Sequence, residues 1–297
     1  MFLSAPRKTR GLRFTTRYRS LLCRHKKTHG VRLDELITML EFLQQFTDVR
    51  RIFQYDYIYI DAVFLLVWIV FLIRNKKYSA LIFGAIIAPI IYFIDSGIWW
   101  NTSAGLNFPA GTFIREYWIS GIQVPHYLGD VLWLKFGADF MMTVSYALFA
   151  FPWIWIMFES IRKSPIDIKQ IVKYTSVYFV LWILVPLFSF FLPIDNTIVE
   201  TVRHMDTQII FMVTNAIAGY LILFVVYRKE LDKVGKIFLI GVTASLIMEI
   251  PLYIFHIRTT GLKFIFFEAF FLLNQGVPYL FLIWDKLLPK IKLRNVV

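Results

Sequence analysis

Cysteine is nearly missing from the 297-residue chain, and the single one, Cys23, lies in a basic segment near the beginning. A lone cysteine excludes a disulfide framework, a thiolate metal site and a CxxC redox pair. The sequence also holds no HExxH motif, no P-loop, no GxGxxG fingerprint and no nucleophile elbow. The usual signatures of metal-, nucleotide- and serine-dependent enzymes are therefore absent, and the sequence indicates no cofactor.

Charged residues are also scarce, at 18% of the chain against about 25% in an average soluble protein. In their place, 58% of the residues are apolar and 18% are aromatic. Apolar runs of about twenty residues recur along most of the length, which is what crossing a hydrocarbon core of about 30 Å requires. This composition excludes a soluble domain. It predicts an all-α, polytopic membrane bundle in which the lipid bilayer is the main partner.

Seven segments are long and apolar enough to cross a bilayer within a single transmembrane domain, residues 56–288. They lie near 57–73, 78–99, 136–158, 174–193, 208–227, 237–256 and 264–284. An eighth span at 117–134 is the alternative. We prefer seven, because that stretch contains Gln123, Pro125, His126 and Asp130, which suit a re-entrant or interfacial segment better than a lipid-facing helix.

The first 35 residues carry most of the formal net charge of +12. They are rich in Lys and Arg and show no interleaving of aromatic and basic residues that would predict nucleic-acid binding. We expect a disordered tail, or a segment outside the natural chain with a start near Met39; a targeting segment is the alternative. Residues 36–55 predict an amphipathic interfacial helix, since Leu36, Leu40 and Leu43 share one face.

The basic residues of the connecting loops predict the orientation. Fifteen Lys and Arg lie in the connections of one side and five in those of the other. Because cytoplasmic loops carry the excess of basic residues, the first side should be cytoplasmic, with the C-terminal tail, 289–297, inside. An odd number of spans then sends the basic first segment outside, which is unfavourable. The eight-span model avoids this, and charge alone does not decide between them.

Five carboxylates fall inside the predicted spans, where no Lys or Arg accompanies them: Asp61, Asp95, Asp139, Glu249 and Glu268. In the seven-span topology all five lie in the outer half of the membrane. Intramembrane acids usually face a bundle interior, a cavity or an ion path. We therefore expect an outward-facing polar cavity lined by uncompensated carboxylates. The alternatives are headgroup water for Asp61 and Asp139, and structural hydrogen bonds between helices for Glu249 and Glu268.

Other polar residues extend this candidate site by helical spacing. Asn215, Gln275 and His256 are added as ligand- or ion-binding candidates, beside Asp95, Asp139, Glu249 and Glu268. The residues around Pro251 and Pro278 predict broken helices whose free carbonyls could line a site. His126, Asp130 and His204 form a weak candidate for a metal site at the outer surface.

Three functions fit this pattern. A proton- or cation-linked transporter of a small solute fits the uncompensated acids best, with that solute or cation as partner. An intramembrane enzyme acting on a lipid or isoprenoid could use buried carboxylates as acid and base. A receptor or assembly protein would merely pack the acids. The sequence does not choose the substrate.

Overall fold

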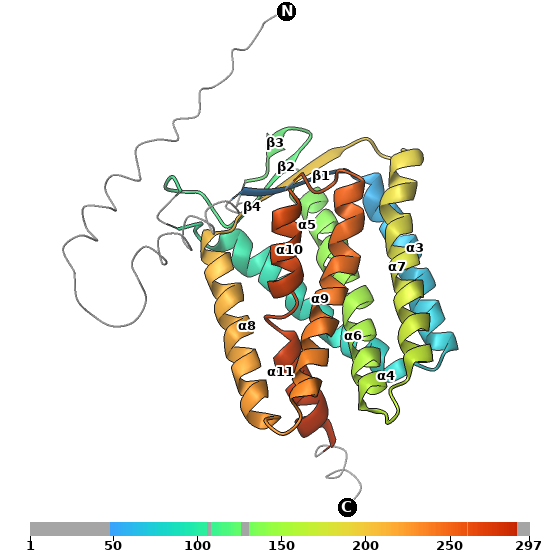
Figure 1. Ribbon diagram of the computed structural model, residues 1–297. Coiled ribbons are helices and arrows are strands. Elements are labelled where there is room, and N and C mark those ends of the chain that lie inside the picture. Colours follow the sequence, from blue (N-terminus) through green and yellow to red (C-terminus); the bar gives the residue numbers. More distant parts are fainter. Residues whose placement is uncertain (1–47, 106–107, 126–130, 260, 290–297) are drawn as a thin grey trace, which may run out of the picture. The chain divides into compact units, whose positions relative to one another are not determined.

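The computed structural model describes residues 48–105, 108–125, 131–259 and 261–289. Within these residues, six helical segments are long and apolar enough to cross a membrane. Figure 1 shows the helices running roughly side by side. Their α-helices are α3 (Asp56–Arg74), α4 (Tyr78–Tyr92), α5 (Leu132–Phe140), α6 (Tyr146–Arg162), α7 (Ile168–Phe191), α8 (Asp206–Val226) and α9 (Leu231–Ile254). The predicted helical bundle is confirmed, and its six apolar helices are compatible with a multi-pass membrane protein.

The last predicted span is helical but broken. It consists of α10 (Leu262–Phe271), a turn over residues 272–276, α11 (Val277–Leu282) and a π-helical end at Ile283–Leu287. Pro278 lies in the first turn of α11, where its missing N–H costs no helical hydrogen bond. The break predicted here is confirmed. The one expected around Pro251 is wrong, because α9 runs through that proline to Ile254.

A four-stranded antiparallel sheet lies at one end of the helices (Figure 1). Its order is β1 (Asp48–Gln54), β4 (Ile198–His204), β2 (Arg115–Ile119) and β3 (Ile122–Gln123). Two predictions are wrong here. The fold is not all-α, because it includes this sheet. Residues 48–54 of the expected interfacial helix are a strand, while 36–47 lie outside the described residues. In the alternative eighth span, 117–134, the described residues hold the β2–β3 hairpin and the beginning of α5.

Alternation along the strands decides which side chains face inward. In β2, Arg115, Tyr117 and Ile119 are buried, while the residues between them are partly exposed. Side chains of a strand alternate between its two faces, so every second residue of β2 belongs to the inner face. Burial repeats at every second residue in the first half of β1, at Val49 and Arg51. Arginines thus enter the buried face of the sheet beside apolar residues.

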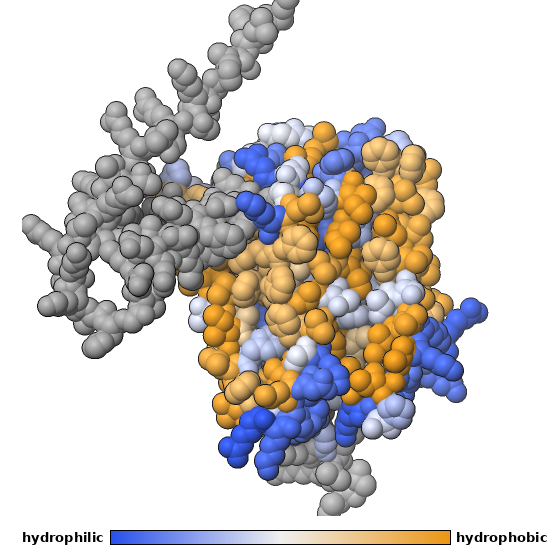
Figure 2. All heavy atoms as spheres, viewed as in Figure 1, coloured by the Kyte–Doolittle hydropathy of each residue, from blue (hydrophilic) through white to orange (hydrophobic). Residues whose placement is uncertain are grey.

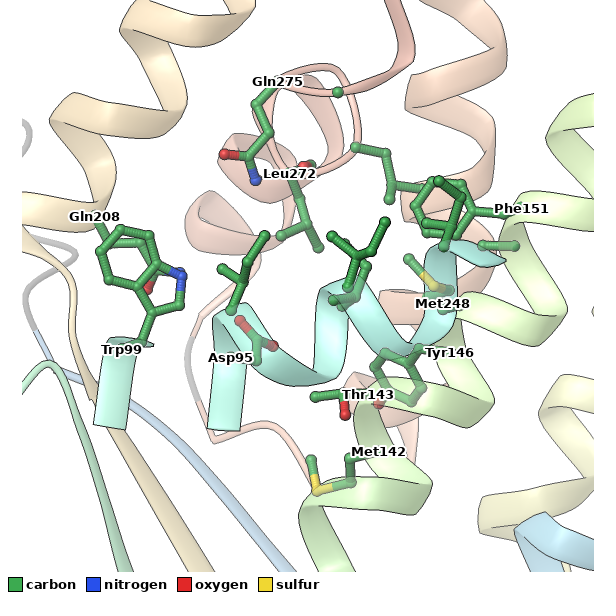
Figure 3. A pocket seen from close by; sticks show the side chains of 18 of the residues that line it. Asp95, Trp99, Met142, Thr143, Tyr146, Phe151, Gln208, Met248, Leu272 and Gln275 are labelled. Atoms are coloured by element: carbon green, nitrogen blue, oxygen red, sulfur yellow. Dashed lines mark hydrogen bonds between the residues drawn. The ribbon is translucent and has the colours of Figure 1, made fainter. Parts of the chain in front are cut away.

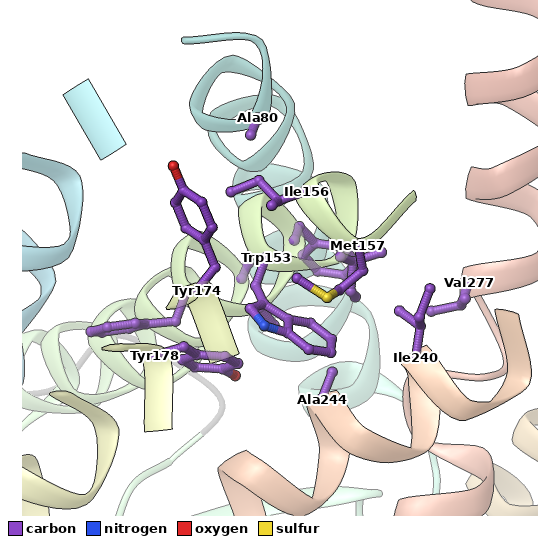
Figure 4. Packing of buried hydrophobic residues seen from close by; sticks show 14 of the residues in the cluster. Ala80, Trp153, Ile156, Met157, Tyr174, Tyr178, Ile240, Ala244 and Val277 are labelled. Atoms are coloured by element: carbon purple, nitrogen blue, oxygen red, sulfur yellow. The ribbon is translucent and has the colours of Figure 1, made fainter. Parts of the chain in front are cut away.

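The hydrophobic core combines aromatic rings with aliphatic side chains (Figure 4). Trp153 and Tyr178, on α6 and α7, lie within it with ring centroids 6.0 Å apart. The Trp182 indole donates a hydrogen bond to the Met248 carbonyl, which ties α7 to α9. Away from the core, large apolar residues remain exposed on the helices. Figure 2 shows them as a broad hydrophobic band with hydrophilic residues at its two ends, as expected for a surface facing lipid.

Gly84 allows α4 to approach α6 closely. A Cβ added there would lie 2.6 Å from the Pro152 Cγ, so the helices would have to shift. We expect Gly84→Ala to lower the free energy of unfolding by about 1–3 kcal/mol, although alanine is the better helix former. Gly235→Ala in α9 is the control, because its added methyl group meets nothing within 4 Å. Equal thermal unfolding midpoints for the two variants in detergent would contradict this role of Gly84.

Candidate functional site

The structure brings together four of the predicted acids, but it also supplies the cations that the sequence analysis did not assign to them. Asp95, Asp139, Glu249 and Glu268 each lie within 4 Å of a buried Arg or Lys. The premise of uncompensated carboxylates is therefore wrong for these four. The cations come from the sheet, from the turn after α9 and from the first turn of α5. They are Arg51, Arg115, Arg203, Arg258 and Lys135.

Two of these arginines face each other directly across the sheet. Arg115 of β2 pairs in register with Arg203 of β4. Like charges in opposite positions of neighbouring strands repel each other. The Asp95 carboxylate lies between them, with Oδ2 at 3.3 Å from Arg115 Nη1 and 3.6 Å from Arg203 Nη2. Asp95 belongs to a π-helical segment, Phe93–Ile98, that continues α4. A helix carboxylate thus bridges a cation pair of the sheet.

The same arrangement occurs a second time. Arg51 of β1 forms an isolated antiparallel bridge with Arg258, in the turn after α9. The Glu249 carboxylate lies between them, 3.2 Å from Arg51 Nη2 and 2.6 Å from Arg258 Nη2. All three side chains are 4% exposed or less, so bulk water solvates these charges poorly. Removing one charge from such a group leaves the others buried and uncompensated.

Asp139 and Glu268 are the other two carboxylates of the network. Asp139 links Arg115 to Lys135 of α5, and Glu268 links Arg203 to Arg258. Asp139 lies 3.0 Å from Arg115 and 3.3 Å from Lys135, and it accepts a hydrogen bond of 2.6 Å from the Tyr117 hydroxyl. Lys135 also lies 3.9 Å from the centre of the Trp100 ring, a cation–π contact. Glu268 connects the two bridges.

Glu268 lies 2.7 Å from Arg258 and 3.6 Å from Arg203. The described groups therefore form one alternating series of charges, from Lys135 at one end to Arg51 at the other. It contains five cations and four carboxylates, so 5 − 4 leaves one positive charge in excess. A buried charge needs a partner to offset the loss of hydration.

Three of the arginines line a cavity of about 380 Å³ among the helices. Arg51, Arg115 and Arg203, with Asp95, form its charged end. The remaining wall is mainly apolar and comes from α4, α6, α8, α9 and the break before α11. Figure 3 shows Asp95 and Trp99 extending from one helix and Tyr146 from another. The carboxylates of Asp139, Glu249 and Glu268 do not belong to the lining.

Arg203 is the least compensated of the three arginines at the cavity. Its two described ion pairs are 3.6 Å each, the longest in the network. Burial lowers the pKa of the Arg203 guanidinium to about 10, and the positive charge of Arg115 acts in the same direction. Burial opposes the charge of Arg115 as well, but Asp95, Tyr117 and Asp139 outweigh it and its pKa is raised. Arg203 therefore stays protonated at neutral pH. Because both of its ion pairs are long, its N–H groups can still donate hydrogen bonds to an anion.

Two widened helical turns lie beside this cavity. The π-helical segment Phe93–Ile98 contributes Asp95, and a second one, Met141–Ser145 between α5 and α6, contributes Thr143. Such turns occur frequently at functional sites, because they redirect side chains that a regular helix would point elsewhere. Both segments place a polar side chain at the cavity.

The other predicted site residues divide into two groups. Asn215 and Gln275 line the cavity, as expected of a site. His256 lies exposed in the turn after α9 and belongs neither to the lining nor to the network. His204 contacts Glu116 at 3.3 Å. His126 and Asp130, the rest of the candidate metal site, lie outside the described residues.

Metal binding gains no support from the part of the chain that the structure describes. It contains no group of three His, Cys, Asp or Glu residues arranged to hold a metal ion.

Asp61 and Asp139 are 0% and 1% exposed, so headgroup water does not surround them. Asp61 accepts a hydrogen bond of 2.8 Å from the Ser145 hydroxyl.

The functional residues that sequence reasoning missed are the five cations. Four of them belong to the five basic residues of the predicted outer connections, and Arg51 falls in the expected interfacial helix, 36–55. The available signal was alternation with a period of two, as in Arg115, Tyr117 and Ile119. No protein-family model, characterised protein or solved structure matches the chain.

Proposed function

We propose that this multi-pass membrane protein binds an anionic substrate in its intramembrane cavity, at Arg51, Arg115 and Arg203. The observation that carries the proposal is the excess of positive charge where these three guanidinium groups meet a cavity whose other walls are mainly apolar. Guanidinium groups bind carboxylate and phosphate oxygens strongly, because each presents several N–H donors in one plane. A bound monoanion would balance the network.

This proposal keeps substrate binding within the membrane but reverses the charge of the expected ligand. The cation-linked transporter drew its support from acids without partners, and four of those acids have arginine or lysine partners. The lipid-modifying enzyme needed Glu249 and Glu268 as acid and base. Both are ion-paired with Arg258 and lie off the cavity lining, which gives that alternative no specific support.

The proposed topology has seven crossings, with the broken segment 262–287 as the seventh and the C-terminus in the cytoplasm. The predicted outer connections hold five basic residues. Four of them, Arg115, Lys135, Arg203 and Arg258, are at most 8% exposed. The basic residues accessible to water are thus concentrated even more strongly at the other end, and the positive-inside rule makes that end cytoplasmic.

Binding of soluble anions to the purified protein tests the proposed function. Inorganic phosphate and acetate should bind saturably, and rubidium should not. Arg203→Gln should weaken phosphate binding about 10- to 100-fold, because a hydrogen bond to a charged group contributes about 1.5–3 kcal/mol. Arg50→Gln is the matched control, since Arg50 neighbours Arg51 on β1 but has a side chain 53% exposed. Saturable rubidium binding without phosphate binding would refute the proposal.

A further inference from the structure

The cavity is larger and more apolar than a small inorganic anion requires. Its charged groups are confined to one end, where Arg115, Arg203 and Asp95 meet. The rest of its 380 Å³ is bounded mainly by isoleucine, leucine, methionine and aromatic side chains. Such walls offer nothing to a hydrated ion, whereas they favour a hydrocarbon chain, which gains free energy by leaving water. The lining therefore matches an amphiphile with a charged end and an apolar end.

The apolar part of the cavity reaches the lipid-facing surface between α4 and α8. Ile90 on α4 and Phe211 on α8 both line the cavity, yet they remain 49% and 51% exposed. Residues that line the cavity and are also exposed on the outer surface of the helices mark the rim of an opening. Both helices belong to candidate membrane spans, so this rim faces hydrocarbon.

Packing around the rim is consistent with an opening at this position. α4 packs chiefly along α6, while α8 packs against α9 and α11, and α4 and α8 make little direct contact with each other. The Trp99 and Phe211 rings, with centroids 5.6 Å apart, connect the two sides near the charged end. A chain bound in the cavity can therefore leave sideways between these helices. It does not have to pass the sheet.

We infer that the anion is the head group of a bilayer lipid. The head group, a phosphate or a carboxylate, lies at Arg51, Arg115 and Arg203, and the hydrocarbon chain passes into the membrane between Ile90 and Phe211. This inference rests on the proposed function and adds the class of substrate and its route. A soluble anion from water is the alternative source of the same head-group chemistry.

Two comparisons test the inference on the full chain in lipid nanodiscs. The first compares the affinities of phosphatidic acid and inorganic phosphate, and of oleate and acetate. The lipid of each pair should bind at least 100-fold more tightly. The second compares loading rates of a fluorescent phosphatidic acid. Ile90→Trp should slow loading at least tenfold by filling the rim.

Ile82→Trp is the matched control for loading, because Ile82 is 59% exposed on the same helix and does not line the cavity. It should load at the natural rate. Equal affinities for the lipid and the soluble anion would overturn the lipid assignment and leave the anion site standing. Unchanged loading of Ile90→Trp, or equal slowing of Ile82→Trp, would overturn the lateral route. Absence of all anion binding would overturn the proposed function and this inference together.

Discussion

Glu249→Gln should destabilise the protein by about 3–5 kcal/mol, the cost of breaking a buried ion pair from one side. The variant leaves Arg51 and Arg258 facing each other, 4% and 0% exposed, without the carboxylate that bridges them. Glu268 can compensate only in part, because its described contacts are with Arg258 and Arg203. Thermal unfolding in detergent measures the effect, with a midpoint lowered by roughly 6–20 °C.

The control for this variant is Asp232→Asn. Asp232 pairs with Lys236 on the surface of α9 and its side chain is 79% exposed. Exposed pairs contribute little to stability, so the unfolding midpoint should hardly move. Similar midpoints for Glu249→Gln and the natural chain would mean that the two arginines do not need their bridge. The network would then have no structural role at that end.

Asp95→Asn should have two effects of opposite sign. It removes the bridge between Arg115 and Arg203, so the ligand-free protein should lose about 1–3 kcal/mol of stability. It also removes the only acid among the described residues of the cavity lining, so phosphate should bind about tenfold more tightly. Added phosphate should then restore the stability, because a ligand that binds only the folded state stabilises it. Unfolding midpoints measured against phosphate concentration check both effects.

Comparison with Glu249→Gln separates ligand rescue from a general salt effect. Glu249 does not line the cavity and that variant keeps Asp95 at the anion site, so phosphate should raise its stability less than it raises that of Asp95→Asn. Equal rescue of the two variants would indicate a nonspecific effect of the salt. Weaker phosphate binding by Asp95→Asn would show that Asp95 helps to bind the substrate and does not compete with it.

The helices could be predicted from the sequence because a bilayer imposes a strong constraint. Each span needs about twenty apolar residues, and six of the seven predicted segments correspond to helices of that kind. The segment predicted as the seventh span is helical as well, with its break before Pro278. Helix type and approximate position follow from local composition, which one sequence contains.

The sheet could not be predicted in the same way. Its strands β1, β2 and β4 are 5–7 residues long, and their pairing joins residues such as Arg51 and Thr201 that lie far apart in the chain. Residues 48–54 also continued a helical pattern of apolar residues. Short segments leave helix and strand ambiguous when only periodicity is used. Pairing between distant strands decides between helix and strand here, and periodicity in one sequence does not reveal it.

For the same reason, the acids of the site could be predicted from the sequence and its arginines could not. The acids stood out because a carboxylate within a long apolar run is unusual, and Asp95 does line a cavity with Asn215 and Gln275. The arginines did not stand out, because a basic residue between two spans normally belongs to a water-exposed loop. Their burial depends on strands that fold back over the ends of the helices. The tertiary structure therefore decides which basic residues compensate the buried acids.

The most direct test of the central claim is to locate an anion and a cation in crystals of the protein by anomalous scattering. Crystals soaked in bromide should give a peak at the charged end of the cavity, among Arg51, Arg115 and Arg203. Crystals soaked in rubidium should give no peak there. A rubidium peak at this position, with bromide absent from the cavity, would contradict the account.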